Sequence, residues 1–502
     1  MSLVGSLRLN LISSWINHAV ALAVGVILMP FVLHILGNEQ YGIWIFISSV
    51  AGYSGLMYLG FGETISRFVA TSYANRDWTK LNQVVSAIWA VYVAMATVAL
   101  AASGLLAWFA PRLYDWGSVP IAEIQCVIVV LGLNIAISLV GSVYSGMLMG
   151  IQRFDIERGI CLAAGLFRLG ITYAVLKHDS GLLAMALIHL SITVVENGAN
   201  YVAAHRLVPS LSVGWRHANL RTLKECSSFS TFAFIDSIST QLIDATDSIV
   251  IGLFLGAEAI VPYYIALRIG QFISRPIQYI GHVSIPRAGE LHVGAESHHL
   301  HRLVFKGAGL AFLLTASCLL GAGYFGRDLV FTWVGAGYDQ SYLILMVLLS
   351  SRVVALTVGV LRSVLFGIGQ MKVASLVYFS EALANIVLSL VLIQSYGILG
   401  VALGTAIPVF VIEFGILLPF ALKTIGVSRS QFIREGLAPQ CVPLLVLWIY
   451  CAGLTVLFPN IHGWAELSAV AVGAGVTLAG TLIAVRYFRR QSVTLASAGC
   501  RG

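Results

Sequence analysis

Fourteen apolar stretches, each long enough to cross a lipid bilayer, fill this chain from Asn10 to Arg486 with little sequence between them. A helix needs about 20 apolar residues to cross the hydrocarbon layer. Of all residues 58% are hydrophobic and 10% are charged, whereas the helices of a soluble core need a polar face. The stretches are also too long and too uniformly apolar for barrel strands. The sequence therefore predicts an all-α polytopic membrane protein with fourteen transmembrane helices.

The predicted crossings are named here by their residue ranges. They are about 10–36, 41–67, 83–110, 121–150, 158–177, 181–205, 227–255, 258–283, 303–325, 341–367, 373–394, 397–420, 439–458 and 464–486.

The basic residues predict the orientation. If the N-terminus is cytoplasmic, 21 of the 29 Lys and Arg residues lie in inner loops and tails, and only Arg112, Lys177 and Arg327 lie in outer loops. Such an imbalance over short loops is a strong positive-inside signal. We expect both the N- and the C-terminus on the cytoplasmic side.

The basic residues, the cysteines and the absence of a phosphate-binding motif argue against other classes of protein. The basic residues are spread over every inner loop, which favours contact with anionic lipid headgroups over a nucleic-acid patch. The seven cysteines show no CxxC pair and no metal-ligand spacing. No phosphate-binding glycine loop followed by Lys and Ser or Thr is present, so we expect no ATP hydrolysis.

An internal repeat predicts the architecture. Leu36-Gly37-Asn38-Glu39-Gln40 at the first outer turn matches Leu255-Gly256-Ala257-Glu258-Ala259 after the seventh crossing. Both copies start on the cytoplasmic side, which predicts two parallel pseudo-symmetric six-helix lobes with a binding site between them.

The predicted domains follow from this repeat. They are an N-lobe at 1–205, a cytoplasmic inter-lobe loop at 206–226, a C-lobe at 227–420, a cytoplasmic loop at 421–438, two extra C-terminal helices at 439–486 and a cytoplasmic tail at 487–502.

Several motifs resemble the polysaccharide transporter family of the multidrug/oligosaccharidyl-lipid/polysaccharide superfamily, the branch with the O-antigen-type flippases. They are Pro30 to Leu33, Leu36-Gly37-Asn38-Glu39-Gln40-Tyr41-Gly42-Ile43-Trp44, Leu59-Gly60-Phe61-Gly62, Arg67-Phe68-Val69-Ala70, Asp247-Ser248-Ile249-Val250-Ile251-Gly252 and Tyr263-Tyr264. The resemblance covers the whole chain in helix number and loop sizes.

The resemblance implies a V-shaped pair of lobes, as in multidrug transporters of the superfamily, around a central cavity. It implies a flippase that moves an undecaprenyl-pyrophosphate-linked oligosaccharide, for O-antigen, capsule or exopolysaccharide, to the outer leaflet of a bacterial cytoplasmic membrane. Polysaccharide polymerase and chain-length proteins are the implied partners. The two extra helices resemble those of lipid-flipping relatives, which implies a groove for the polyprenyl tail; a structural or docking role stays open.

Five arginines lie inside the predicted crossings: Arg168, Arg268, Arg275, Arg352 and Arg362. An arginine near the bilayer centre costs about 2.5–3.5 kcal/mol on insertion scales, so it should face a partner or a cavity. Arg268, Gln271 and Arg275 recur at spacings of three and four, which places them on one helical face. A guanidinium matches phosphate oxygens in a bidentate way. We therefore expect Arg268 and Arg275, with Arg168 or Arg352, to hold the pyrophosphate.

The alternative is that each arginine pairs with an acid and joins two helices. Seven acids lie at membrane depth: Glu63, Glu196, Asp236, Asp244, Asp247, Glu381 and Glu413. Asp236, Asp244 and Asp247 lie near one face of the seventh crossing, where they could bind a coupling H⁺ or Na⁺ or balance the arginines next door. No other cofactor is expected.

Two prolines inside crossings, Pro30 and Pro276, interrupt helical hydrogen bonding and are possible hinges of a rocking transporter. The first rival function is an ion-coupled multidrug or cation antiporter of the same superfamily. The second is a membrane glycosyltransferase or polymerase, which the outer loops at 111–120 and 326–340 are too short to favour.

Overall fold

The computed structural model describes residues 3–177, 181–294, 296–458 and 463–499. In these ranges the chain consists of helices joined by turns, and no strand occurs. Eleven helices are long and apolar enough to cross a membrane. The prediction of an all-α polytopic membrane protein is confirmed.

Two of these eleven spans contain a sharp break at a glycine. Helix α1 (Leu3–Gly52) changes direction at Gly37, with φ 71° and ψ 176°. Helix α11 (Met371–Pro408) does so at Gly397, with φ 56° and ψ −136°. Such backbone angles are open almost only to glycine. Both breaks fall where the sequence predicts the end of one crossing and the start of the next, and the count of fourteen crossings stays a prediction.

The second predicted crossing differs from a single straight helix. It begins in α1 and continues as a 3₁₀-helical segment, η1 (Tyr53–Tyr58). It is then interrupted at Leu59 and Gly60, where φ is 50° and 72°. Helix α2 (Phe61–Ala74) then continues the chain. Gly60 reaches its positive φ at little cost, whereas positive φ is unfavourable for Leu59.

The two predicted repeat turns have the same backbone conformation. Gly256, after helix α7 (Leu220–Leu255), has φ 89° and ψ 169°, close to the angles of Gly37. The turns also pack together: a Cβ at Gly42 would collide with the carbonyl oxygen of Ala257. The glycines of the repeat are thus required by the fold.

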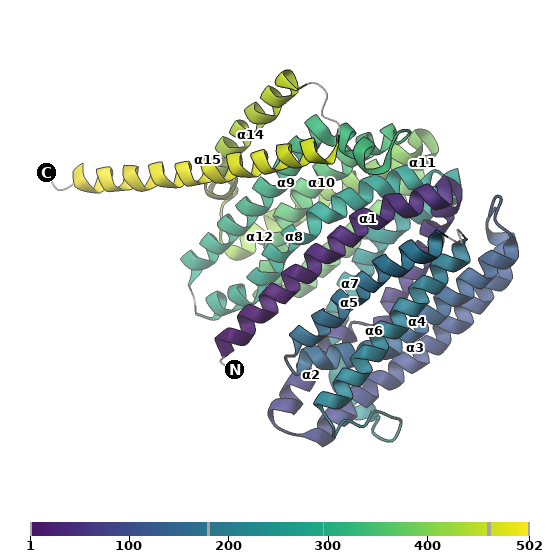
Figure 1. Ribbon diagram of the computed structural model, residues 1–502. Helices are drawn as coiled ribbons and strands as arrows, with labels where there is room; N and C mark the ends of the chain where they lie inside the picture. The colour runs from purple at the N-terminus through teal and green to yellow at the C-terminus, as the bar shows by residue number, and fades with distance from the viewer. Residues whose placement is uncertain (1–2, 178–180, 295, 459–462, 500–502) are drawn as a thin grey trace. The chain divides into compact units, whose positions relative to one another are not determined.

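The N-terminal unit, Met1–Val261, is a helical bundle. Its further helices are α3 (Trp78–Leu113), α4 (Ile121–Gly150), α5 (Phe154–Leu176) and α6 (Leu182–Leu207). Helix α4 packs against α3 and α6, and α1 packs against α5 (Figure 1). The apolar core between α2, α3 and α4 includes Leu81, Ile88, Leu139 and Met147.

The C-terminal unit, Pro262–Gly502, contains most of α8 (Ile260–Val293) and the rest of the chain. Its other elements are α9 (Ser297–Val334), α10 (Asp339–Gly367), α11, a π-helix η2 (Val409–Leu417), α12 (Leu418–Ile425), α13 (Arg429–Gln431), a second π-helix η3 (Phe432–Leu437), α14 (Ala438–Leu457) and α15 (Trp464–Gly499). Helix α10 packs against α9 and α11, and α14 packs against α9 and α15. The predicted lobe boundaries concern the sequence repeat and stay predictions.

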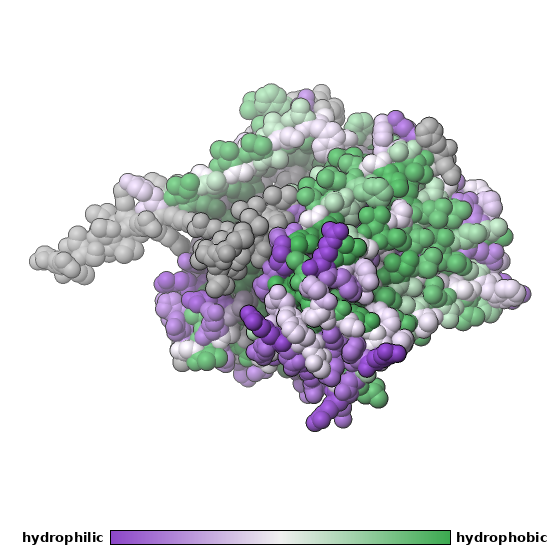
Figure 2. Space-filling view, turned by 60° about the horizontal axis from the view of Figure 1, so that its bottom comes forward, coloured by the Kyte–Doolittle hydropathy of each residue, from purple (hydrophilic) through white to green (hydrophobic). Residues whose placement is uncertain are grey.

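Large apolar side chains are exposed on many helices, among them Leu105, Val387, Val411 and Val472. Figure 2 shows apolar residues over much of the visible face and hydrophilic residues gathered toward one end. This surface fits a hydrocarbon environment for the helices and water at their ends.

Candidate functional site

Arg268, in the first third of α8, is half-buried and contacts two neighbours on the same helix. Its Nε donates to Tyr264 Oη at 2.7 Å and its guanidinium lies 4.8 Å from the centre of the Tyr264 ring. A second nitrogen donates to Gln271 Oε1 at 3.3 Å. These two neighbours orient the plane of the guanidinium.

The structure brings Arg268 and Gln271 together as the spacing predicts. Arg275 lies on the same helix and is exposed. Arg352, in α10, is half-buried. Arg168, in α5, belongs to the N-terminal unit, where its charge acts on His189 of α6. The binding roles predicted for these five residues remain predictions.

Arg362 lies beside an acid of another element, as the alternative interpretation predicts. It lies 3.9 Å from Glu413 Oε1 of the π-helix η2, and its guanidinium stacks 3.9 Å from the centre of the Tyr378 ring. Glu413 and Glu381 are 2% and 4% exposed, and the charge of Glu381 acts on Glu413. The sequence indicated Arg362, Glu381 and Glu413 as candidates but not their pairing.

The acids of α7 lie in the N-terminal unit. Asp247 is 2% exposed, and Asp236 and Asp244 are half-buried. Around them α7 packs closely on η1: Tyr53 Oη and Thr246 Oγ1 are 2.5 Å apart. Their predicted ion-coupling role stays a prediction. The side chain of Glu63 lies outside the described part of the chain.

The two predicted hinges lie within helices. Pro30 is inside α1 and Pro276 is inside α8. The break in α1 occurs at Gly37, seven residues beyond Pro30. Hinge motion at either proline remains a prediction.

A buried acid cluster of the N-terminal unit was not predicted as a site. Glu157 of α5 is 6% exposed, lies 3.3 Å from Arg158 and accepts from Ser145 at 3.4 Å. The thiol of Cys161 lies 3.5 Å from an oxygen of Glu157 and from one of Glu196. Glu157 stands at the edge of an apolar stretch in the sequence, so nothing there marked it as buried.

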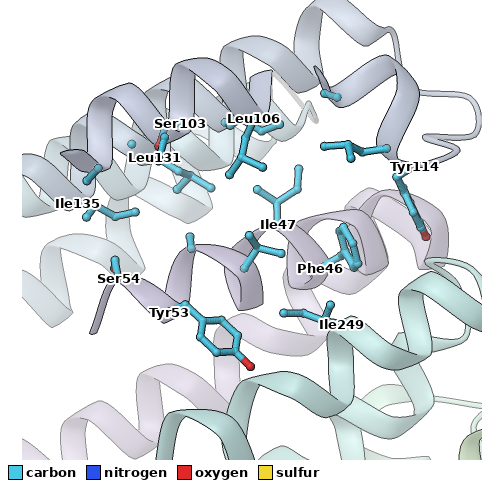
Figure 3. A pocket seen from close by; sticks show the side chains of 18 of the residues that line it. Phe46, Ile47, Tyr53, Ser54, Ser103, Leu106, Tyr114, Leu131, Ile135 and Ile249 are labelled. Carbon is cyan, nitrogen blue, oxygen red and sulfur yellow. The ribbon is translucent and has the colours of Figure 1, made fainter. Parts of the chain in front are cut away.

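The N-terminal unit contains an apolar chamber of about 400 Å³ between α1, α3, α4 and α7 (Figure 3). Its walls include Ile47, Leu106, Leu131 and Ile249, and its few polar groups are hydroxyls such as that of Ser103. No pattern in the sequence indicates this chamber, because apolar side chains that line a cavity cannot be told from those of a packed core by sequence alone.

A second cavity of about 400 Å³, the vestibule, shares Leu113, Tyr114, Trp116 and Leu253 with the chamber. The vestibule is formed by the two repeat turns and the loop after α3, and Glu39 lines it. In this turn between two predicted crossings, Glu39 accepts hydrogen bonds from Ser118 N and Oγ, both at 2.7 Å. These bonds hold the pKa of the Glu39 carboxyl below its usual value, so it is ionised at neutral pH.

The model of a family described as "Polysaccharide biosynthesis protein" matches residues 9–292. A Shigella flexneri protein that carries the name of an O-antigen transporter is 20% identical over 415 residues, covering 80% of this chain and 94% of that protein.

Solved structures share the fold. The lipid II flippase MurJ in an inward closed conformation has a TM-score of 0.68 at 14% identity, covering 97% of this chain and all of that chain. A multidrug resistance MATE transporter in an inward-facing conformation has a TM-score of 0.65 at 15% identity, with 82% and 94% covered. At these identities the likeness concerns the fold alone.

Proposed function

Because the chain belongs to the polysaccharide biosynthesis protein family, we propose that it moves a lipid-linked oligosaccharide across the bacterial cytoplasmic membrane, from the inner to the outer leaflet. The substrate class is an undecaprenyl-pyrophosphate-linked repeat unit of O-antigen, capsule or exopolysaccharide. The name of the Shigella relative and the flippase among the fold neighbours support this class.

The proposed topology has fourteen crossings and cytoplasmic termini. Each half of α1 and α11 beyond its glycine break is a crossing, and α8 is a further one although it is not among the eleven apolar spans. Helix α8 is too polar to count among those apolar spans, because it carries Arg268, Arg275 and other polar residues. This count agrees with the distribution of basic residues in the sequence.

The observation that carries the proposal is the arrangement of Arg268. It is a half-buried arginine within a membrane helix, oriented by Tyr264 and Gln271. Arginine at such depth is costly and marks a substrate path. We assign Arg268 to the pyrophosphate, with Gln271 and Arg275 on its helix and Arg168 and Arg352 as further contacts, while the lobes alternate access to the two leaflets.

The polyprenyl chain needs an apolar path. A cavity of about 950 Å³ in the C-terminal unit lies between α9, α14 and α15 and is lined by Leu310, Leu313, Leu482 and Ile483. Lys306 and Glu435 line the same cavity. Its largely apolar wall suits a hydrocarbon tail, which supports a tail-binding role for the two extra helices.

A second function is an ion-coupled multidrug or cation antiporter. The buried acids Asp247, Glu381 and Glu413 favour it, since acids at membrane depth carry protons or bind cations. The same acids would serve ion coupling in a flippase, with H⁺ or Na⁺, so they do not separate the two functions.

The test is complementation of a strain that lacks its own O-antigen flippase. Wild type, Arg268→Ala and Arg268→Lys are compared at matched membrane levels, with Arg287→Ala as the control. Arg287 is an exposed arginine of the same helix that pairs with Glu290. Loss of a charge-assisted bidentate contact should lower surface glycan about tenfold or more in both Arg268 variants.

Surface glycan restored by wild type and by Arg287→Ala alone would support the proposal. Restoration by all four proteins would leave Arg268 a structural residue. If wild type restores no glycan in strains with several different repeat units and instead confers resistance to cationic drugs, the antiporter function replaces the flippase.

A further inference from the structure

The vestibule joins two chemically distinct surfaces. Its polar part carries three carboxylates, Glu39, Asp115 and Glu258. Its inner wall is aromatic, with Tyr114 and Trp116, which also line the apolar chamber that Figure 3 shows. Glu39 and Glu258 occupy equivalent places in the internal repeat. No Lys or Arg is among the described residues that line it.

The walls of the vestibule are held in place. Tyr114 stacks on Phe46, with ring centres 4.7 Å apart at 15°. Trp116 meets Tyr114 edge-on at 5.0 Å and donates from Nε1 to the carbonyl oxygen of Ala110 at 2.8 Å. Ser118 holds Glu39 with two hydrogen bonds. A site with such walls is preorganised, so a ligand loses little affinity to ordering them.

One polar atom of this wall lacks a partner. The hydroxyl of Tyr114 is buried and has no hydrogen-bond partner among the described residues. An unsatisfied buried hydroxyl is unfavourable, and a ligand that supplies a donor or an acceptor relieves it. Tyr114 lines both cavities, so such a ligand would lie where they meet.

The chemistry of the walls selects the ligand. Ionised carboxylates only accept hydrogen bonds, so they suit a donor-rich ligand and repel phosphate. Tyrosine and tryptophan offer an apolar face and a polar edge. A sugar ring has hydroxyl donors at its rim and C–H faces above and below, and a hydrocarbon chain attached to it fits the apolar chamber. The volume of each cavity is within the range of small-ligand sites.

We propose that the vestibule binds a saccharide through Glu39, Asp115, Glu258 and Tyr114, with the hydrocarbon chain attached to that saccharide in the apolar chamber. In the proposed topology the repeat turns and the loop after α3 face the outer side. The site is then open on the outer side to a glycoside that has no phosphate between sugar and chain. Its position rests on the topology of the proposed flippase, whereas the binding itself does not.

The test is photolabelling of the purified full-length protein in lipid nanodiscs. The probe is dodecyl β-maltoside with a diazirine in its chain, and a dodecyl phosphocholine with the same chain and diazirine is the head-group control. Labelled peptides are mapped by mass spectrometry. We expect the maltoside to label the chamber segments around Ile47, Leu106 and Ile249, and unlabelled dodecyl β-maltoside to compete.

Variants separate sugar recognition from burial of a chain. Glu258→Gln removes one charge, and Tyr114→Phe removes only the hydroxyl and keeps the ring stacking. Each should lower maltoside labelling of the chamber about fivefold to tenfold, without changing labelling by the phosphocholine. Asp339→Asn, at an exposed aspartate outside the vestibule, should change neither.

Equal labelling by both probes that Glu258→Gln and Tyr114→Phe leave unchanged would overturn the proposal. Displacement of the probe by tetraethylammonium but not by unlabelled maltoside would show a cation site instead, and would overturn it too. Failure of wild type to restore surface glycan, with the labelling pattern intact, would remove the flippase function and leave the saccharide site. Restored glycan without chamber labelling would support the flippase function and overturn the saccharide site.

Discussion

The pair of Arg362 and Glu413 shows how one arginine at membrane depth is stabilised. Glu413 is buried, and Arg362 is its charged neighbour at 3.9 Å while also stacking on Tyr378. A second buried acid, Glu381, lies near this pair, and its charge acts on Glu413. Removal of either charge therefore changes the balance of three groups, not of two.

Arg362→Ala should destabilise the protein by about 3 kcal/mol, since it leaves a buried acid without its cation. We place it at the lower end of the usual range because the Arg362 side chain is 24% exposed. The measurement is thermal unfolding in detergent, and Arg434→Ala, at an exposed arginine, is the control.

The double variant Arg362→Ala with Glu413→Gln should recover a good part of the loss, because the neutral amide needs no cation. Additive losses in the double variant would show that the two side chains do not stabilise each other.

At each of the two repeat turns, a glycine in an unusual backbone conformation separates one helical segment from the next. Gly37 and Gly256 have nearly equal angles, in a region that is essentially restricted to glycine. Neither would meet another atom through an added Cβ, so backbone strain is the only cost of substitution.

Gly37→Ala and Gly256→Ala should each destabilise the protein by about 1–3 kcal/mol, and by similar amounts. Gly321→Ala is the control, since Gly321 lies inside α9 with open space around it. Unfolding midpoints in detergent provide the comparison. A large effect at Gly321 with none at the two turns would contradict the assignment.

Much of the helical layout could be predicted, because each crossing needs a long apolar run that the sequence displays directly. The turns at Gly37 and Gly256 were visible as a repeat. The interruption at Leu59 and the π-helix that carries Glu413 were not, since the residues there are as apolar as their neighbours.

The candidate site was predictable only where its parts share one helix. Arg268 and Gln271 are three residues apart, so periodicity alone placed them together. Glu381 and Glu413 come from different elements, and Tyr114 meets Phe46 across a long stretch of chain. Such contacts depend on how the helices pack, and no periodicity or spacing in a single sequence indicates that packing.

At the scale of the whole molecule, the orientation in the membrane can be tested. Asp339→Cys and Asn75→Cys, at exposed residues of predicted outer and inner loops, are made in a cysteine-free background. A membrane-impermeant thiol reagent should label Asp339→Cys in intact spheroplasts, and Asn75→Cys only after permeabilisation. The reverse pattern would invert the topology, and labelling of both in intact spheroplasts would contradict the odd number of crossings predicted between them.

The vestibule at Glu39 and Glu258 has a pharmacological consequence. Its walls come from the two repeat turns and the loop after α3, which the proposed topology directs away from the cytoplasm. A sugar-mimicking inhibitor could therefore reach it from the periplasm without entering the cell. Efflux pumps and slow permeation through the inner bilayer, which defeat many antibacterial compounds, would not protect this target.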